Sequence, residues 1–184
     1  TVTFTMPDED VVLNGAIASG ELVMEKGWPK DSNEGKISCS GTGWSYDHNT
    51  KTLTLTSNSG TYDFSLANPQ DTTKITSADS DVACKIEIQS GAKINGGTFE
   101  KDVKNNDGGT ISKGTFASSV TNSGTIENGT FASSVTNSGT IEKGSFNGTV
   151  QNNGGKISSG TFNGTVINNV NGEISGGTFK SSVS

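Results

Sequence analysis

Arginine is absent from this chain, so all 13 of its cationic side chains are lysines, and the formal net charge is −6. Proteins that bind nucleic acid neutralise phosphates with clustered Lys and Arg, so this composition argues against nucleic acid as a partner. Arginine is also the side chain that grips carboxylates in a bidentate manner. Its absence disfavours an enzyme that cleaves uronate polymers, although lysine can hold such anions more weakly.

Histidine and cysteine are nearly as scarce, which limits catalytic and metal chemistry. His48 is the single histidine, and without a Gly-x-Ser-x-Gly motif we expect it to be a solvated turn residue beside Asp47. A zinc site needs three or four ligands, so we expect no metal and no cofactor. Cys39 and Cys84 form either one disulfide, worth about 3–4 kcal/mol of stability, or two buried free thiols. We favour the free thiols.

Hydrophobic residues make up only 29% of the 184 residues, whereas 25 residues are glycine. This is too little apolar surface for a large globular core. Disorder is the other reading of such a composition, but disordered chains do not place Phe, Val and Ile at a fixed period. No run approaches the roughly 20 apolar residues that cross a membrane, so we expect no membrane insertion.

A Gly-Thr-Phe or Gly-Ser-Phe motif recurs at intervals of 15 to 17 residues through the C-terminal part of the chain. Its aromatic residues, the expected structural stack, are Phe99, Phe116, Phe131, Phe146, Phe162 and Phe179. Such a period predicts an all-β fold, a single-stranded parallel β-helix or β-solenoid. We expect right-handed winding, because right-handed crossovers dominate parallel sheets. Each coil should lengthen the stack by about 4.8 Å.

The alternation within one coil predicts which side chains face inward. Counting from Phe131, the residues Val135, Asn137 and Ile141 share its parity and should face the same side of an extended chain. Five residues separate Ile141 from Phe146, and this odd interval reverses the alternation. A corner is therefore expected at residues 142–144, where glycine supplies the unusual backbone angle.

Asparagine recurs at one of these inward positions. The set comprises Asn122, Asn137 and Asn152, with Asn105 or Asn106 before it and Asn168 or Asn169 after it. Stacked amides form hydrogen-bonded ladders, but asparagine is equally common in turns with left-handed backbone. The sequence leaves both readings open. In neither is asparagine catalytic.

The chain divides into three parts. Residues 1–18 form the end strand of a preceding module or cap, residues 19–70 form a β-rich N-terminal cap, and residues 71–184 form the solenoid, regular from residue 94. Within the cap, turn residues 47–50 join two alternating segments into a hairpin. The last coil lacks a polar cap, so we expect that the parent protein continues past Ser184 and that this fragment associates end to end.

Two segments carry a family resemblance. TFTMPDEDVVL resembles the closing strand pair of repeat modules in bacterial surface proteins, and GWSYDHNTKTLTL resembles the hairpin that opens many β-solenoid surface modules of gut bacteria. The chain thus resembles the Gly-Thr-Phe-repeat β-solenoid modules of gut-bacterial cell-surface proteins, some of which are labelled carbohydrate-binding. This resemblance implies an extracellular location at the bacterial cell surface and partners among glycans or host and cell-surface proteins.

Aromatic residues supply the candidate binding site. Trp44 and Tyr46 lie two residues apart on an expected strand, hence on one face, where sugars could stack while Asp47 and Asn49 bind hydroxyl groups. The alternative, which we favour, is that these rings close the open end of the solenoid.

Paired carboxylates suggest a sugar-cleaving site, and Glu127 and Glu142 occupy equivalent repeat positions. We interpret them as solvated corner charges, because later coils have serine there. The sequence therefore predicts a non-enzymatic structural or adhesin-type module that acts as a stalk or display surface. A carbohydrate-binding module is the alternative.

Overall fold

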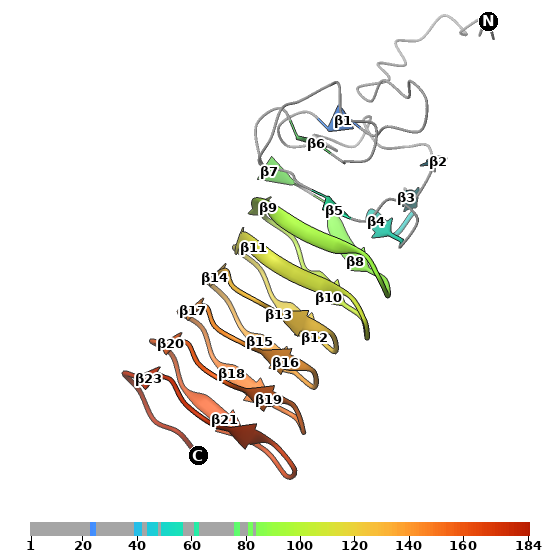
Figure 1. Cartoon of the computed structure of the whole chain (residues 1–184). Helices are drawn as coiled ribbons and strands as arrows, with labels where there is room; N and C mark the ends of the chain where they lie inside the picture. Colours follow the sequence, from blue (N-terminus) through green and yellow to red (C-terminus); the bar gives the residue numbers. More distant parts are fainter. Residues whose placement is uncertain are drawn as a thin grey trace, which may run out of the picture.

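The computed structural model describes residues 84–184 without a break and, before them, residues 23–24, 39–41, 44–47, 49–56, 61–62, 76–77 and 81–82. The described residues form strands, turns and bends with no helix. Consecutive coils stack along one axis (Figure 1), and equivalent strands of neighbouring coils pair in parallel. The predicted parallel β-solenoid is confirmed. Residues 1–18, assigned to a preceding module or cap, lie outside the described residues.

Each regular coil has three short strands, and these form three columns. The valine column contains β10 (Val103–Asn105), β12 (Val120–Asn122), β15 (Val135–Asn137), β18 (Val150–Asn152) and β21 (Val166–Asn168). The isoleucine column contains β13 (Thr125–Ile126), β16 (Thr140–Ile141), β19 (Lys156–Ile157) and β22 (Glu173–Ile174). The phenylalanine column contains β14 (Thr130–Phe131), β17 (Ser145–Phe146), β20 (Thr161–Phe162) and β23 (Thr178–Phe179).

Two longer strands, β9 (Lys93–Phe99) and β11 (Thr110–Phe116), run through both the isoleucine and the phenylalanine columns and join them into one 12-stranded sheet. The short strands β5 (Thr61–Tyr62) and β7 (Asp81–Val82) pair in parallel with β9. A separate two-stranded sheet contains β1 (Val23–Met24) and β6 (Thr76–Ser77).

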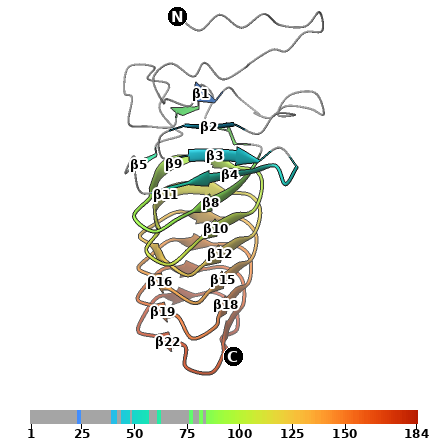
Figure 2. The same ribbon diagram turned by 90° about the vertical axis from the view of Figure 1, so that its right-hand side faces the viewer.

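The valine column continues toward the N-terminus as a nine-stranded sheet through β8 (Lys85–Ile88), β4 (Thr52–Leu55), β3 (Trp44–Asp47) and β2 (Cys39–Gly41). These strands lie one above another in Figure 2. β4 pairs in parallel with β8, but β3 pairs antiparallel with β4 and with β2. The predicted hairpin is therefore confirmed.

Phenylalanine rings form a continuous stack inside the solenoid. Neighbouring ring centroids from Phe99 to Phe179 lie 4.7–4.9 Å apart, with interplanar angles of 4–9°. The rings from Phe99 to Phe162 are fully buried, and Phe179 in the last coil is partly buried. Full burial of one such ring contributes about 1.5–3 kcal/mol, and each ring shares its environment with the coils on both sides.

Glycine makes the corner between the isoleucine and phenylalanine columns possible. Gly144 has φ 153°, in the region that side chains rarely adopt, and a Cβ built there would lie 3.0 Å from the Phe146 ring. The predicted corner at residues 142–144 is confirmed. A second glycine, Gly139, lies so close to the coil below that a Cβ would come within 2.1 Å of the carbonyl oxygen of Gly124.

The inward asparagines form a ladder, which decides between the two readings of the sequence. From Asn105 through Asn122, Asn137 and Asn152 to Asn168, each side-chain Nδ2 donates to the next Oδ1 at 2.7–2.8 Å. Each Nδ2 also donates to a glycine carbonyl oxygen of its own coil, at 2.9–3.2 Å. Those carbonyls fix the orientation of the amides, so the ladder has a direction.

The ladder begins at Asn105 because the preceding coil has Ile88 at the equivalent position. In the part of the chain that the structure describes, Asn105 Oδ1 is the one buried side-chain polar atom without a hydrogen-bond partner. An isoleucine cannot donate to it, so the hydrophobic core of the N-terminal coils and the amide ladder meet at this atom.

We predict that Phe131→Ala lowers the free energy of unfolding by about 3–5 kcal/mol, because the cavity lies between two coils that cannot close it without bending the stack. The exposed Glu142→Gln is the control and should change it by less than about 0.5 kcal/mol. Urea unfolding of both variants gives the two values. Equal loss in both would contradict a core role for Phe131.

We also predict that Asn137→Asp destabilises the protein in a pH-dependent way. The new carboxylate would face Asn152 Oδ1 and the Gly139 carbonyl, where Asn137 Nδ2 now donates. Asn122 would still donate to one carboxylate oxygen, but the oxygen in place of Nδ2 would be buried against two acceptors, which raises the pKa of this Asp above its unfolded value of about 3.9. The folded state then binds more protons, so stability falls as pH rises from about 4, by up to about 1.4 kcal/mol per pH unit, until the folded-state pKa is passed.

Thermal unfolding at pH 3.5, 5 and 7 measures this effect. Asn147→Asp is the matched control, because Asn147 is exposed and its Oδ1 accepts a hydrogen bond from Asn163 on the outside of the solenoid. A pH dependence in the Asn137 variant no steeper than in this control would rule out a buried amide position.

Candidate functional site

The N-terminal aromatic candidates lie on β3. Trp44 pairs with Leu55 across the hairpin, and its side chain is only 3% exposed. A sugar cannot stack on a ring that lies in the hydrophobic core, so the position of Trp44 matches the alternative in which it closes the end of the solenoid. The side chain of Tyr46 lies outside the described residues, as does His48.

The polar candidates beside these rings form a turn. Asp47 Oδ1 accepts from the backbone N–H of Asn49 at 2.9 Å, and Asp47 Oδ2 accepts from Thr50 Oγ1 at 2.9 Å. Asn49 is exposed. The Asp47 carboxylate therefore holds the chain reversal between β3 and β4 in place. This local role needs no ligand.

The carboxylates Glu127 and Glu142 have different surroundings. Glu142 is exposed, as expected of a solvated corner charge, whereas Glu127 is half-buried and bound on two sides. Lys93 Nζ lies 3.0 Å and 3.2 Å from its two oxygens, and Ser112 Oγ donates a short hydrogen bond to Oε2. Neither glutamate lines either of the two grooves that follow the glycine corners of the described coils.

The hydrogen bond from Ser112, followed by the contact with Lys93, lowers the pKa of Glu127. A carboxylate with a lowered pKa adds stability above its unfolded pKa and loses it as pH falls through the folded value. The effect is small at this solvated site. Glu127 thus links three coils rather than acting as an acid with a raised pKa, which glycoside hydrolysis requires.

Cys84 is a buried free thiol and forms no disulfide. At this position the structure agrees with the favoured prediction of buried free thiols. Nothing is described of the Cys39 side chain. Burial raises the pKa of Cys84 to about 12. The thiolate, which is the reactive form, is therefore scarce at neutral pH, and Cys84 behaves as a core residue.

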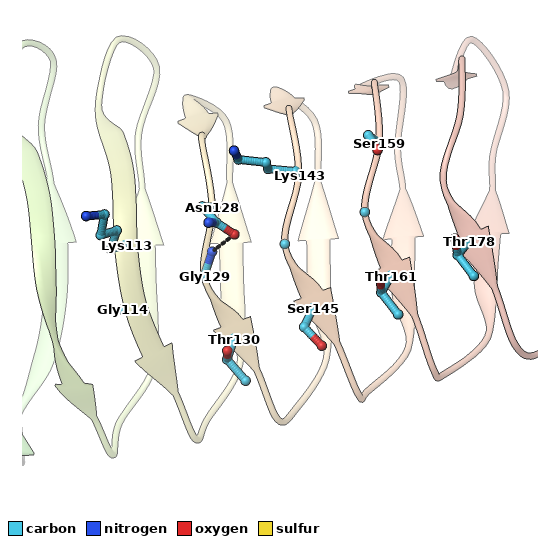
Figure 3. Close-up of a pocket in the computed structure, with 12 residues that line it drawn as sticks. Lys113, Gly114, Asn128, Gly129, Thr130, Lys143, Ser145, Ser159, Thr161 and Thr178 are labelled. Atoms are coloured by element: carbon cyan, nitrogen blue, oxygen red, sulfur yellow. Dashed lines mark hydrogen bonds between the residues drawn. The ribbon is translucent and has the colours of Figure 1, made fainter.

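Two grooves follow the glycine corners along the outside of the solenoid, and sequence reasoning did not identify either. The first, of about 550 Å³, lies between the isoleucine and phenylalanine columns (Figure 3). Its floor is the row Gly114, Gly129, Gly144 and Gly160. One wall carries Lys113, Asn128, Lys143 and Ser159, and the other carries Thr130, Ser145, Thr161 and Thr178.

The second groove, of about 490 Å³, lies between the valine and isoleucine columns. It contains charges of both signs, namely Asp107, Lys156 and Glu173, among serines, threonines and glycines. Lys156 Nζ lies 3.7 Å from Glu173 Oε1, so charges of opposite sign pair within this groove. The first groove contains two lysines and no acidic residue.

Within the described ranges, no group of three or more His, Cys, Asp or Glu residues is placed to hold a metal ion. The same residues contain no helix that could span a bilayer. Comparison of the chain with family models, with curated proteins and with solved structures gives no match. The class that the described residues define is a parallel β-solenoid with three strands per regular coil.

Proposed function

We propose that this chain is a non-enzymatic structural module, a β-solenoid spacer or display surface on the outside of a bacterial cell that serves adhesion. The observation that carries the proposal is the use of the inward side chains. In every regular coil they are a valine, an asparagine, an isoleucine and a phenylalanine, each stacked on its equivalent in the next coil. This arrangement stabilises the shape of the rod and leaves none of these inward side chains available for a catalytic role.

Stacking of equivalent coils makes length adjustable. In such a fold each unit contacts only its neighbours, so stability is nearly a sum over coils and contacts between coils. Val120 pairs with Val135, and Val135 pairs with Val150, in the same register. A coil can therefore be removed without leaving an unmatched surface. A spacer needs this property, whereas a site formed by particular residues of one coil would not survive the deletion.

The extracellular location rests on the sequence. The segment GWSYDHNTKTLTL supports it through its resemblance to hairpins that open bacterial surface modules, and it forms the described hairpin β3–β4 next to the first coils. Antibody labelling of intact cells of the source bacterium tests the location. Labelling that requires permeabilised cells would contradict it.

We predict that deleting residues 135–149, one complete 15-residue coil, leaves a folded protein shorter by about 4.8 Å. Val150 would then pair with Val120, and both the phenylalanine stack and the asparagine ladder would close without a gap. Small-angle scattering measures the length, and circular dichroism measures the thermal stability. The melting temperature should fall by only a few degrees, because one unit of an additive array is lost.

Deletion of residues 135–148 is the matched control. It leaves Thr149 as one extra residue between Phe131 and Val150, where every regular coil keeps a spacing of four residues, and so puts the joined valine strand out of register with the phenylalanine strand before it. The melting temperature of this variant should fall further than that of the complete-coil deletion. If both deletions destabilise the protein equally, the coils are not interchangeable, and the spacer proposal fails.

A further inference from the structure

The first groove differs from the rest of the surface in charge. The protein has a formal net charge of −6, yet the lining of this groove contains Lys113 and Lys143 and no acidic residue. Both lysines are exposed, and Glu142, which precedes Lys143 in the chain, does not line the groove. Three lysines outside the groove are paired with carboxylates instead, namely Lys93 with Glu127, Lys104 with Glu87 and Lys156 with Glu173.

The two lysines occupy equivalent positions two coils apart, with Asn128 between them. In Figure 3 Lys113, Asn128, Lys143 and Ser159 follow one another along one wall of the groove. The coil steps, measured between the stacked rings of Phe116, Phe131 and Phe146, are 4.9 Å and 4.7 Å. The positions of Lys113 and Lys143 thus lie about 9.6 Å apart along the stack, a period of two coils. This period is close to the length of one disaccharide in an extended β-linked polysaccharide.

The opposite wall presents hydroxyl groups at half this period. Thr130, Ser145, Thr161 and Thr178 are in register from coil to coil. Within the described part of the chain these four hydroxyl groups have no hydrogen-bond partner, and all four line the groove. Each hydroxyl can both donate and accept, as the hydroxyl groups of a sugar require. The glycine floor leaves room for the chain of the ligand between the walls.

We propose that this groove binds a linear acidic polysaccharide that carries a carboxylate on alternate sugars, with its chain along the solenoid axis. Lys113 and Lys143 bind successive carboxylates, and the threonine and serine wall binds the sugar hydroxyls. The lining contains no aromatic side chain, so the affinity comes from charge and hydrogen bonds and decreases with salt. The proposal goes beyond the spacer function, which stands without it.

Isothermal titration of the full chain with a hyaluronan octasaccharide, whose carboxylates alternate, tests the proposal. We expect a dissociation constant below about 1 mM at low salt. The double variant Lys113→Gln/Lys143→Gln should weaken binding about tenfold, since each exposed contact between opposite charges contributes about 0.2–1 kcal/mol. Lys104→Gln/Lys156→Gln changes the net charge equally outside this groove and should leave the affinity within twofold.

Three results would overturn the proposal. The first is the absence of measurable binding between the folded protein and hyaluronan octasaccharide at about 1 mM and low salt. A dissociation constant below about 1 mM would be detected under these conditions. The second is an equal loss of affinity in the two double variants, which would assign the binding to overall charge. The third is equally tight binding of a neutral N-acetylchitohexaose or of inorganic polyphosphate. Such binding would show that the groove selects neither carboxylate spacing nor sugar.

Discussion

The need of a buried amide for hydrogen-bond partners determines much of this structure. Asn122, Asn137 and Asn152 are fully buried, where an unsatisfied amide costs about 1–3 kcal/mol. Each gains its partners from the equivalent asparagine of the next coil and from a glycine carbonyl of its own coil. A shift of one residue in any coil would break contacts in both neighbours. The ladder therefore fixes the register, and the register fixes the phenylalanine stack.

The glycine rows follow from the same close approach. Gly139 lies where a side chain would collide with the coil below, and Gly144 adopts a backbone angle that only glycine tolerates easily. Both rows lie on corners, where the absence of side chains leaves grooves on the outer surface. The interior thus specifies a uniform rod, while variation between coils is confined to outward positions. Binding specificity must therefore come from those outward positions.

Much of the fold could be predicted from the sequence. The recurrence of residues equivalent to Phe131, Val135 and Ile141 gives the coil length, and their alternation within one coil gives the inward face. The ladder could not be separated from turns, since asparagine suits either environment and only the backbone decides. Trp44 illustrates a similar ambiguity. An aromatic residue on a strand can bind sugar or close a core, and its burial depends on how the N-terminal hairpin joins the first coils.

The grooves were not predicted because they arise from backbone geometry at glycine corners rather than from a motif. A signal was nevertheless present in the aligned repeats. Lys113, Asn128 and Lys143 occupy the position before the corner glycine in successive coils, so positive charge alternates there. Alignment of the outward positions coil by coil shows this row, just as the inward positions show the core.

The most direct test of the account is the exchange of side-chain amide hydrogens, measured by nuclear magnetic resonance in deuterated water. If the ladder holds the coils in register, the Nδ2 hydrogens of Asn122, Asn137 and Asn152 should persist for hours at neutral pH. Those of Asn147, which is exposed, should exchange at once. Equally rapid exchange at all four positions in the folded protein would contradict the ladder and, with it, the proposed basis of the solenoid.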